Sequence, residues 1–219
     1  MKEIFRYNRR LATAALILVI VVTIFADTNF ALISDKKDVT NAYKDDSLSS
    51  SVLKCADEAA LMYSAVENSG GKVADKAKER LDTLRKRASS PTGLEDTLSD
   101  VYTDVIAVYE QNPNDKTVKK HFDSVGDVLD ALASSSDYNE ASAEYNETRS
   151  GLLCRLIAPW FDKAADFSSL YDRYRTNFDL PSEPPSSDDG SLGDWIADHW
   201  FLTLVILLGI GVVAKVEKK

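Results

Sequence analysis

The sequence predicts an all-α protein, an antiparallel up-and-down bundle of four to five long helices flanked by N-terminal and C-terminal membrane segments. Three observations support this prediction. Apolar residues alternate at spacings of four and three in three separate segments, which is the pattern of helices packed side by side. Only 6 of the 219 residues are proline and 9 are glycine, so few residues interrupt a helix. An uncharged apolar run lies near each end of the chain.

The first membrane segment lies in residues 1–34, where a basic flank precedes 16 uncharged residues at 11–26. As a helix this run is about 24 Å long, somewhat short of a hydrocarbon core of about 30 Å. It fits either a signal peptide or an uncleaved anchor. Cleavage after Ala26 would place Ile24 where signal peptides carry a small residue, so the sequence favours the anchor.

The second membrane segment is predicted at 195–219, where residues 200–214 carry no charge and a basic tail follows. Residues 179–194 are rich in proline, serine and acidic residues, which predicts an extended tether. Basic residues flank the outer ends of both apolar runs, so the positive-inside rule places both termini in the cytoplasm. The helical domain, 36–178, is then extracytoplasmic, and the lipid bilayer is an expected partner.

The first two helices of this domain are expected at 38–68, with an interruption near Asp45 and Asp46, and at 72–88. The third helix carries a regular four-three apolar pattern over 94–108. The fourth begins near Lys116 and repeats the pattern. Continued in register, the pattern runs through Asn139 and Asn146 to Ile157 as one rod, which Pro159 ends.

A last helix is predicted from the same spacing further along the chain, with an apolar face formed by Trp160, Ala164, Phe167, Tyr171, Tyr174 and Phe178. Its aromatic residues form a candidate interaction or packing stripe, namely Trp160, Phe161, Phe167, Tyr171 and Tyr174.

A repeated tyrosine-asparagine pair occurs in the fourth predicted helix, as Tyr138-Asn139 and Tyr145-Asn146. Seven residues is nearly two helical turns, so the two tyrosines share one face and the two asparagines share the adjacent face. A buried asparagine in such a helix weakens packing but fixes the register between helices. We therefore expect the pair to be a structural motif, with ligand recognition as the alternative.

This region resembles the bacterial LemA family, in which a long helix carries YN, five residues, YN, and then an aliphatic stretch and a terminal aromatic residue. The aliphatic positions here are 156–158, and Phe161 and Phe167 follow. The resemblance covers about residues 95–167 well and the earlier helices only in layout. The segment after the second YN, "GLLCRLIAP", departs from the family pattern. The resemblance implies a membrane-anchored helical bundle with no established catalytic residues to carry over.

The composition argues against several kinds of chemistry. A net charge of -9 disfavours nucleic acid as a partner. The two histidines, His121 and His199, have no neighbours at metal-ligand spacing, and no cofactor motif is present. Cys55 and Cys154 lie far apart in the sequence, so they are either free thiols or a disulfide between touching helices. We expect neither an enzyme nor a bound cofactor.

Two functions are compatible with this sequence. The first is a scaffold or interaction protein at the cell envelope, with an unidentified envelope or membrane protein as its partner and an unknown oligomeric state. The second is a ligand-binding or sensor module that signals through another membrane protein. The predicted cytoplasmic ends are about ten and five residues long, too short for an output domain of their own. The sequence therefore favours the scaffold.

Overall fold

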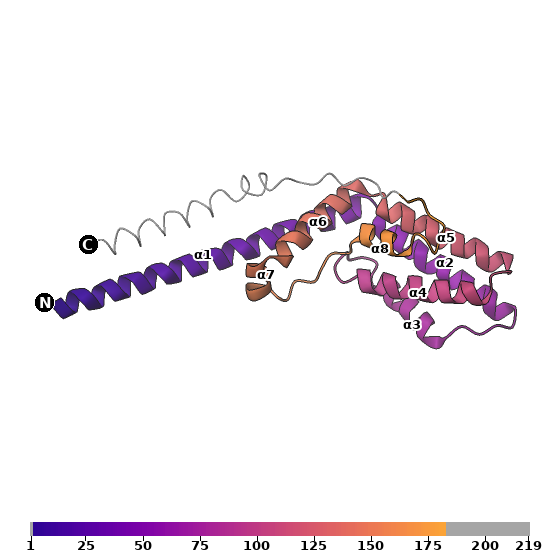
Figure 1. Ribbon diagram of the computed structural model, residues 1–219, viewed down its shortest axis with the longest axis horizontal. Helices are drawn as coiled ribbons and strands as arrows, with labels where there is room; N and C mark the ends of the chain where they lie inside the picture. Colours follow the sequence, from indigo (N-terminus) through magenta and orange to yellow (C-terminus); the bar gives the residue numbers. More distant parts are fainter. Residues whose placement is uncertain (1, 183–219) are drawn as a thin grey trace.

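The computed structural model describes residues 2–182 (Figure 1). These residues form eight helices and no β-strand, apart from one isolated bridge between Thr92 and Ala164. The prediction of an all-α protein is confirmed. The predicted C-terminal span and all but the start of the tether lie outside the described residues. The helices are α1 (Lys2–Asp45), α2 (Leu48–Asn68), α3 (Asp75–Arg87), α4 (Glu95–Gln111), α5 (Lys116–Ala133), α6 (Ser136–Ser150), α7 (Leu152–Ile157) and α8 (Phe167–Tyr174).

Helix α1 has two parts with different surroundings. It is continuous over 44 residues. The predicted boundary between the membrane segment, 1–34, and the helical domain, 36–178, therefore falls inside one helix. In the first part, apolar side chains such as Leu18 and Val19 are more than half exposed. In the second part, Leu32, Val39 and Tyr43 are fully buried. Among the described helices, α1 is the one long and apolar enough to be a membrane span, and its position near the N-terminus also fits a signal sequence.

The chain bends at two places that lie next to each other. Helix α1 ends at Asp45 and α2 begins at Leu48, which confirms the predicted interruption. Ser47 makes this turn with a φ of 55°. Helices α5 and α6 are separated at residues 134–135, and the Ser135 hydroxyl donates a hydrogen bond to the Asp46 carboxylate. Because α5 packs against α2 and α6 packs against α1, two long helix pairs bend at the same level (Figure 1).

The prediction of a single rod from residue 116 to 157 is therefore wrong. The chain is broken into three helices, with interruptions at residues 134–135 and at Gly151. Serine side chains compete with helical main-chain hydrogen bonds, and Ser134 donates its hydroxyl to the Asp130 carbonyl at the end of α5. The break also shifts the buried face of α6 by one residue. Tyr138, Ser142 and Tyr145 are buried, whereas Ala143 is exposed.

The part of the molecule distant from the N-terminus consists of α2, α3, α4, α5 and α8, which pack on one another (Figure 1). An aromatic cluster fills the space between α4, α5 and the turn after α8. The ring centroid of Phe178 lies 4.7 Å from that of Phe122 and 6.0 Å from that of Tyr102. Gly126 allows this approach, because a Cβ atom there would lie 3.0 Å from the Cβ of Phe178.

The long last helix predicted from Trp160 onward is also not formed. Residues 158–166, which we name the linking segment, are non-helical, and α8 covers only Phe167–Tyr174. Asp166 caps α8 by accepting a hydrogen bond from the Ser169 amide at 2.8 Å. The linking segment stays extended because its main-chain groups have partners elsewhere in the fold.

Candidate functional site

Tyr138 is fully buried where α6, α1 and the start of α8 meet. Its ring centroid lies 5.6 Å from that of Tyr43 and 4.8 Å from that of Phe167. Its hydroxyl donates a hydrogen bond of 2.9 Å to the carbonyl of Ala165 in the linking segment. Burial raises the pKa of Tyr138 above its ordinary value, so the hydroxyl stays a protonated donor at neutral pH. The first tyrosine of the repeat thus joins three elements.

Tyr145 and Asn146 bind the linking segment at Asp162 and Ala164, which precede the Ala165 that Tyr138 binds. The buried Tyr145 donates its hydroxyl to the Asp162 carbonyl at 2.8 Å. The Asn146 amide bonds both main-chain groups of Ala164, donating to its carbonyl and accepting from its N–H, each at 3.0 Å. A side-chain amide used this way replaces the peptide group of a neighbouring strand. Arg149 adds a hydrogen bond from Nε to the carbonyl of Phe161.

We call Tyr138, Tyr145, Asn146 and Arg149 the α6 clamp. All four bind main-chain atoms of residues 161–165. The opposite side of the linking segment is bonded to the loop before α4. The Gly93 amide donates to the Lys163 carbonyl, and the Ala165 amide donates to the Pro91 carbonyl, each at 2.9 Å. These partners explain why the segment needs no helix to satisfy its main chain.

Asn139 has a different role from Asn146. Its Nδ2 donates to the Ala133 carbonyl at 2.7 Å, across the break between α5 and α6. It therefore satisfies a carbonyl left free at the end of α5. The expectation that the pair is a structural motif fits both residues, because Asn139 bonds the end of a neighbouring helix and Asn146 bonds the extended linking segment.

The aromatic stripe predicted over Trp160, Phe161, Phe167, Tyr171 and Tyr174 does not lie on one helix face. The Trp160 side chain is 63% exposed, and Phe161 is half-buried with the Lys36 ammonium 5.8 Å from its ring centroid. The last three residues belong to α8 and are buried. The Tyr174 hydroxyl contacts the hydroxyl of Ser99 at 2.7 Å, and Tyr171 donates to the Pro181 carbonyl at 3.1 Å.

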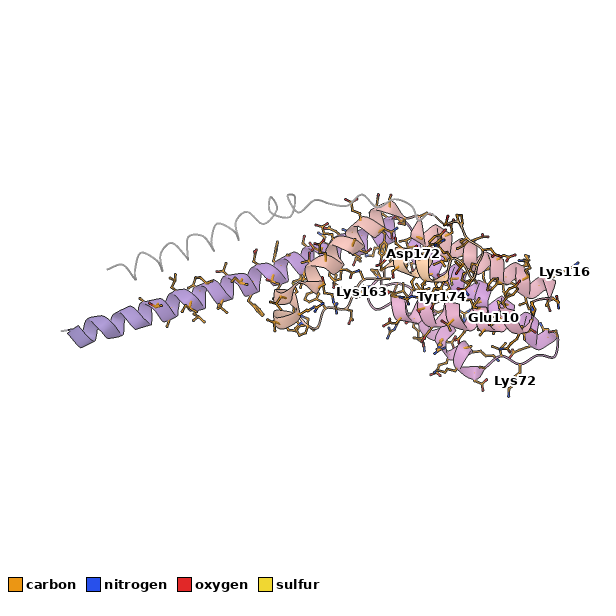
Figure 2. The ribbon with its side chains drawn as sticks, viewed as in Figure 1. Lys72, Glu110, Lys116, Lys163, Asp172 and Tyr174 are labelled. Carbon is orange, nitrogen blue, oxygen red and sulfur yellow. The ribbon has the colours of Figure 1, made fainter. Side chains whose placement is uncertain are left out.

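Ionisable groups near the clamp form ion pairs rather than a reactive cluster. One carboxylate oxygen of Glu95 lies 3.0 Å from the Lys163 ammonium and accepts a hydrogen bond from the Asp166 amide at 3.2 Å. In the distal part of the body, His121 Nδ1 on α5 lies 2.7 Å from the Glu58 carboxylate on α2. Within the described residues, no group of three His, Cys, Asp or Glu side chains could hold a metal ion. Cys55 and Cys154 are free and buried in α2 and α7. Figure 2 shows the side chains of the molecule and labels Lys163, which belongs to the linking segment.

Sequence reasoning missed Arg149 and the linking segment. Arg149 follows Tyr145 by four residues, so helical spacing already places it on the tyrosine face. No local sequence pattern predicts that it binds residues 161–165, because the contact joins α6 to a non-helical segment that follows a separate helix. The clamp hydroxyls and amide are fully engaged with main chain, so their chemistry is that of a fold-stabilising joint.

No protein-family model, curated protein or solved structure matches this chain. Its class is therefore defined by its own architecture, an all-helical protein with one described helix, α1, long and apolar enough to be a membrane span or a signal sequence.

Proposed function

We propose that this protein is a non-enzymatic, LemA-like helical scaffold anchored in the cytoplasmic membrane by α1, with its helical body on the extracytoplasmic side. The observation that carries the proposal is the continuity of α1. One helix contains an apolar part that the protein leaves exposed and a second part whose side chains are fully buried in the body. An apolar helix exposed on all sides has the properties of a membrane span.

The joint between anchor and body supports a scaffold role because buried contacts and hydrogen bonds cross it. Tyr43 packs against Tyr138 and donates its hydroxyl to the Ala88 carbonyl at 2.8 Å. Helix α6 lies along the second part of α1, and the α6 clamp fixes the linking segment to it. A body held this way keeps a defined position relative to the bilayer, as a protein that positions envelope partners requires.

The LemA-like assignment is supported by the role of its repeated pair. The family resemblance implies that YN pairs belong to a long helix in a membrane-anchored bundle. Here both tyrosines and the second asparagine hold one extended segment, which gives the spacing of seven a physical purpose. We also propose that the two helix pairs and α3, α4 and α8 form a bundle of near-parallel helices.

Cysteine labelling tests the topology. Lys72 lies at the far end of the body (Figure 2), so Lys72→Cys is compared with Lys219→Cys in a chain carrying Cys55→Ala and Cys154→Ala. A membrane-impermeant maleimide should label position 72 in intact cells and position 219 only after permeabilisation. The reverse pattern would rule out an extracytoplasmic body.

Crosslinking tests the scaffold role. A photo-reactive residue is placed at Lys72 or at Lys116 on the far end of the body (Figure 2), and in a third chain at Val19 in the apolar part of α1. In intact cells the first two positions should crosslink to the same envelope or membrane protein, and the third should not. Absence of any adduct from the body would contradict the proposal.

A further inference from the structure

The membrane-proximal end of the body carries apolar side chains that the protein leaves uncovered. We name Phe30, Ile33, Leu152, Leu156 and Trp160 the proximal patch, and their exposed fractions are 74, 58, 76, 73 and 63%. These are the five most exposed large hydrophobic residues outside the segment 17–25 within the described part of the chain. Leu152 and Leu156 are four residues apart and share one face of α7.

Three contacts fix the level of this patch along α1. The Phe161 ring lies under Lys36, and the Trp160 ring centroid is 6.4 Å from that of Phe161. Helix α7 itself packs against α1. In Figure 1, α7 is the part of the body that reaches furthest toward the N-terminal end of α1. Leu152, Leu156 and Trp160 therefore lie beside α1 at about the level of residues 30–36, where Phe30 and Ile33 are themselves exposed.

The depth of that level follows from helix geometry. The 16 uncharged residues at 11–26 rise about 24 Å, and the next four residues, which begin with Asp27, bring the helix to about 30 Å at Phe30, the thickness of a hydrocarbon core. Residues 31–36 cover about the next 9 Å, and the headgroup region is roughly 5 to 8 Å thick on each side. A tryptophan, a pair of leucines and an exposed arginine, Arg155, lie at that level. Tryptophan is enriched at the membrane interface, and arginine can extend its charge toward headgroups.

We propose that α7 and Trp160 form an interfacial contact, in which the proximal patch inserts into the lipid headgroup region beside the α1 span. The inference rests on the proposed anchoring by α1. Lipid is the occupant that the structure favours, because Phe30 and Ile33 continue the exposed apolar surface of residues 17–25 along α1, and Leu152, Leu156 and Trp160 lie beside them. A bilayer surrounds α1 on every side, so patch residues on different elements reach it at one depth. The α1 span, α7 and Trp160 would then all hold the body at the membrane, rather than α1 alone.

Tryptophan fluorescence in the full-length chain tests this contact. Trp195 and Trp200 are replaced by phenylalanine so that Trp160 is the one emitter, and the chain is reconstituted into phosphatidylcholine and phosphatidylglycerol vesicles. Lipids brominated near the headgroup end of their chains should quench Trp160, and its emission should shift to the blue relative to the detergent-solubilised chain. Two reference chains carry Trp160→Phe with either Val19→Trp, within the span, or Lys116→Trp, at the far end of the body. The first should be quenched by lipids brominated near the ends of their chains, since position 19 lies near the middle of the span, and the second should be quenched by neither lipid.

The reference chains separate the possible failures. Quenching at position 19 without quenching at 160 would overturn the interfacial contact and leave the anchor standing. Quenching at neither position would overturn the anchor and the contact together. A blue shift of Trp160 without quenching would mean that another protein surface covers the patch, which also overturns the inference.

A second measurement uses exposed leucines that are not needed for packing. Leu152→Ser with Leu156→Ser should reduce the quenching of Trp160, because the neighbouring insertion is lost. Leu53→Ser with Leu61→Ser is the matched control, since these two exposed leucines lie on α2 in the distal part of the body. Equal quenching in both double variants would contradict a contact made by α7.

Discussion

Asn146 shows how one side chain can control the path of a distant segment. Its amide bonds both main-chain groups of Ala164, whereas Asn139 makes a single bond to the end of α5. A main-chain partner cannot be exchanged for an apolar group by mutation. Replacing Asn146 with an apolar residue therefore leaves two polar groups of Ala164 without a partner.

Asn146→Leu should lower the free energy of unfolding by about 1 to 3 kcal/mol, since a donor and an acceptor of Ala164 become unsatisfied. Asn139→Leu, which removes one bond, is the matched comparison and should cost less. Chemical denaturation of the two variants measures both values. Equal and negligible losses would show that the amide does not hold the linking segment.

Tyr138 combines a packing role with a hydrogen bond, and two substitutions separate them. Tyr138→Phe keeps the ring and should cost about 1 kcal/mol through loss of the bond to Ala165. Tyr138→Ala also empties the space between Tyr43 and Phe167 and should cost about 3 to 5 kcal/mol. Thermal and urea denaturation provide the comparison. An alanine variant as stable as the phenylalanine variant would contradict the packing role.

Buried phenols and thiols should make the fold sensitive to alkali. Burial raises the pKa of Tyr145 and of Cys55 each to about 12, from ordinary values of 10.0 and 9.0. These groups ionise more readily in the unfolded chain, so the stability they confer is complete below about pH 9 and is lost as the pH rises toward 12. The melting temperature should be level from pH 7 to about 9 and fall above it. Tyrosinate absorbance of Tyr145, taken as the difference from a Tyr145→Phe chain, that develops near pH 10 in a still-folded protein would contradict this.

At the scale of elements, the two bends and the linking segment decide the shape of the molecule. The bend between α1 and α2 meets the bend between α5 and α6, where Ser135 bonds Asp46. The two long helix pairs therefore stay in contact on both sides of the bends (Figure 1). The element after α8 is joined to α5 just as closely, through the contact of Phe178 with Gly126.

Gly126→Ala tests this close approach between α5 and the turn after α8. A methyl group there would lie 3.0 Å from the Cβ of Phe178, and such overpacking costs about 1 to 3 kcal/mol. Better helix propensity returns about 1 kcal/mol, so a net loss of up to about 2 kcal/mol is expected. Urea denaturation measures it.

Asp127→Ala is the control for helix propensity, because Asp127 is the exposed neighbour on α5. In a chain that already carries Phe178→Ala, the Gly126→Ala change should cost less free energy of unfolding than it does in the parent, because the ring that it meets is gone. A Gly126→Ala variant more stable than the parent would show that Phe178 moves away freely.

At the scale of the whole molecule, α1 belongs to two environments, and the boundary between them lies before Leu32. Removal of residues 1–28 together with 183–219 should leave a folded, soluble body, because the removed part of α1 buries little in the protein. Removal of residues 1–44 also takes away Leu32, Val39 and Tyr43 and should cost about 5 to 9 kcal/mol of burial. Circular dichroism melts of the two truncated chains compare them. If the chain lacking residues 1–44 melts like the chain lacking residues 1–28, the second part of α1 does not stabilise the body.

The amino-acid sequence by itself determined the helical class, the interruption near Asp46, the shared helix face of Tyr138 and Tyr145, and the apolar part of α1. These features follow from the local sequence pattern, since a helix has 3.6 residues per turn and residues three or four apart share a face. Tertiary structure alone decided that residues 158–166 are extended, that Asn146 bonds Ala164, and that the rod after Lys116 breaks at Ser135. The physical reason is that main-chain groups accept whichever partner the fold brings near. The α6 side chains and the loop at Pro91 become such partners only after packing, and no local pattern in the sequence records them.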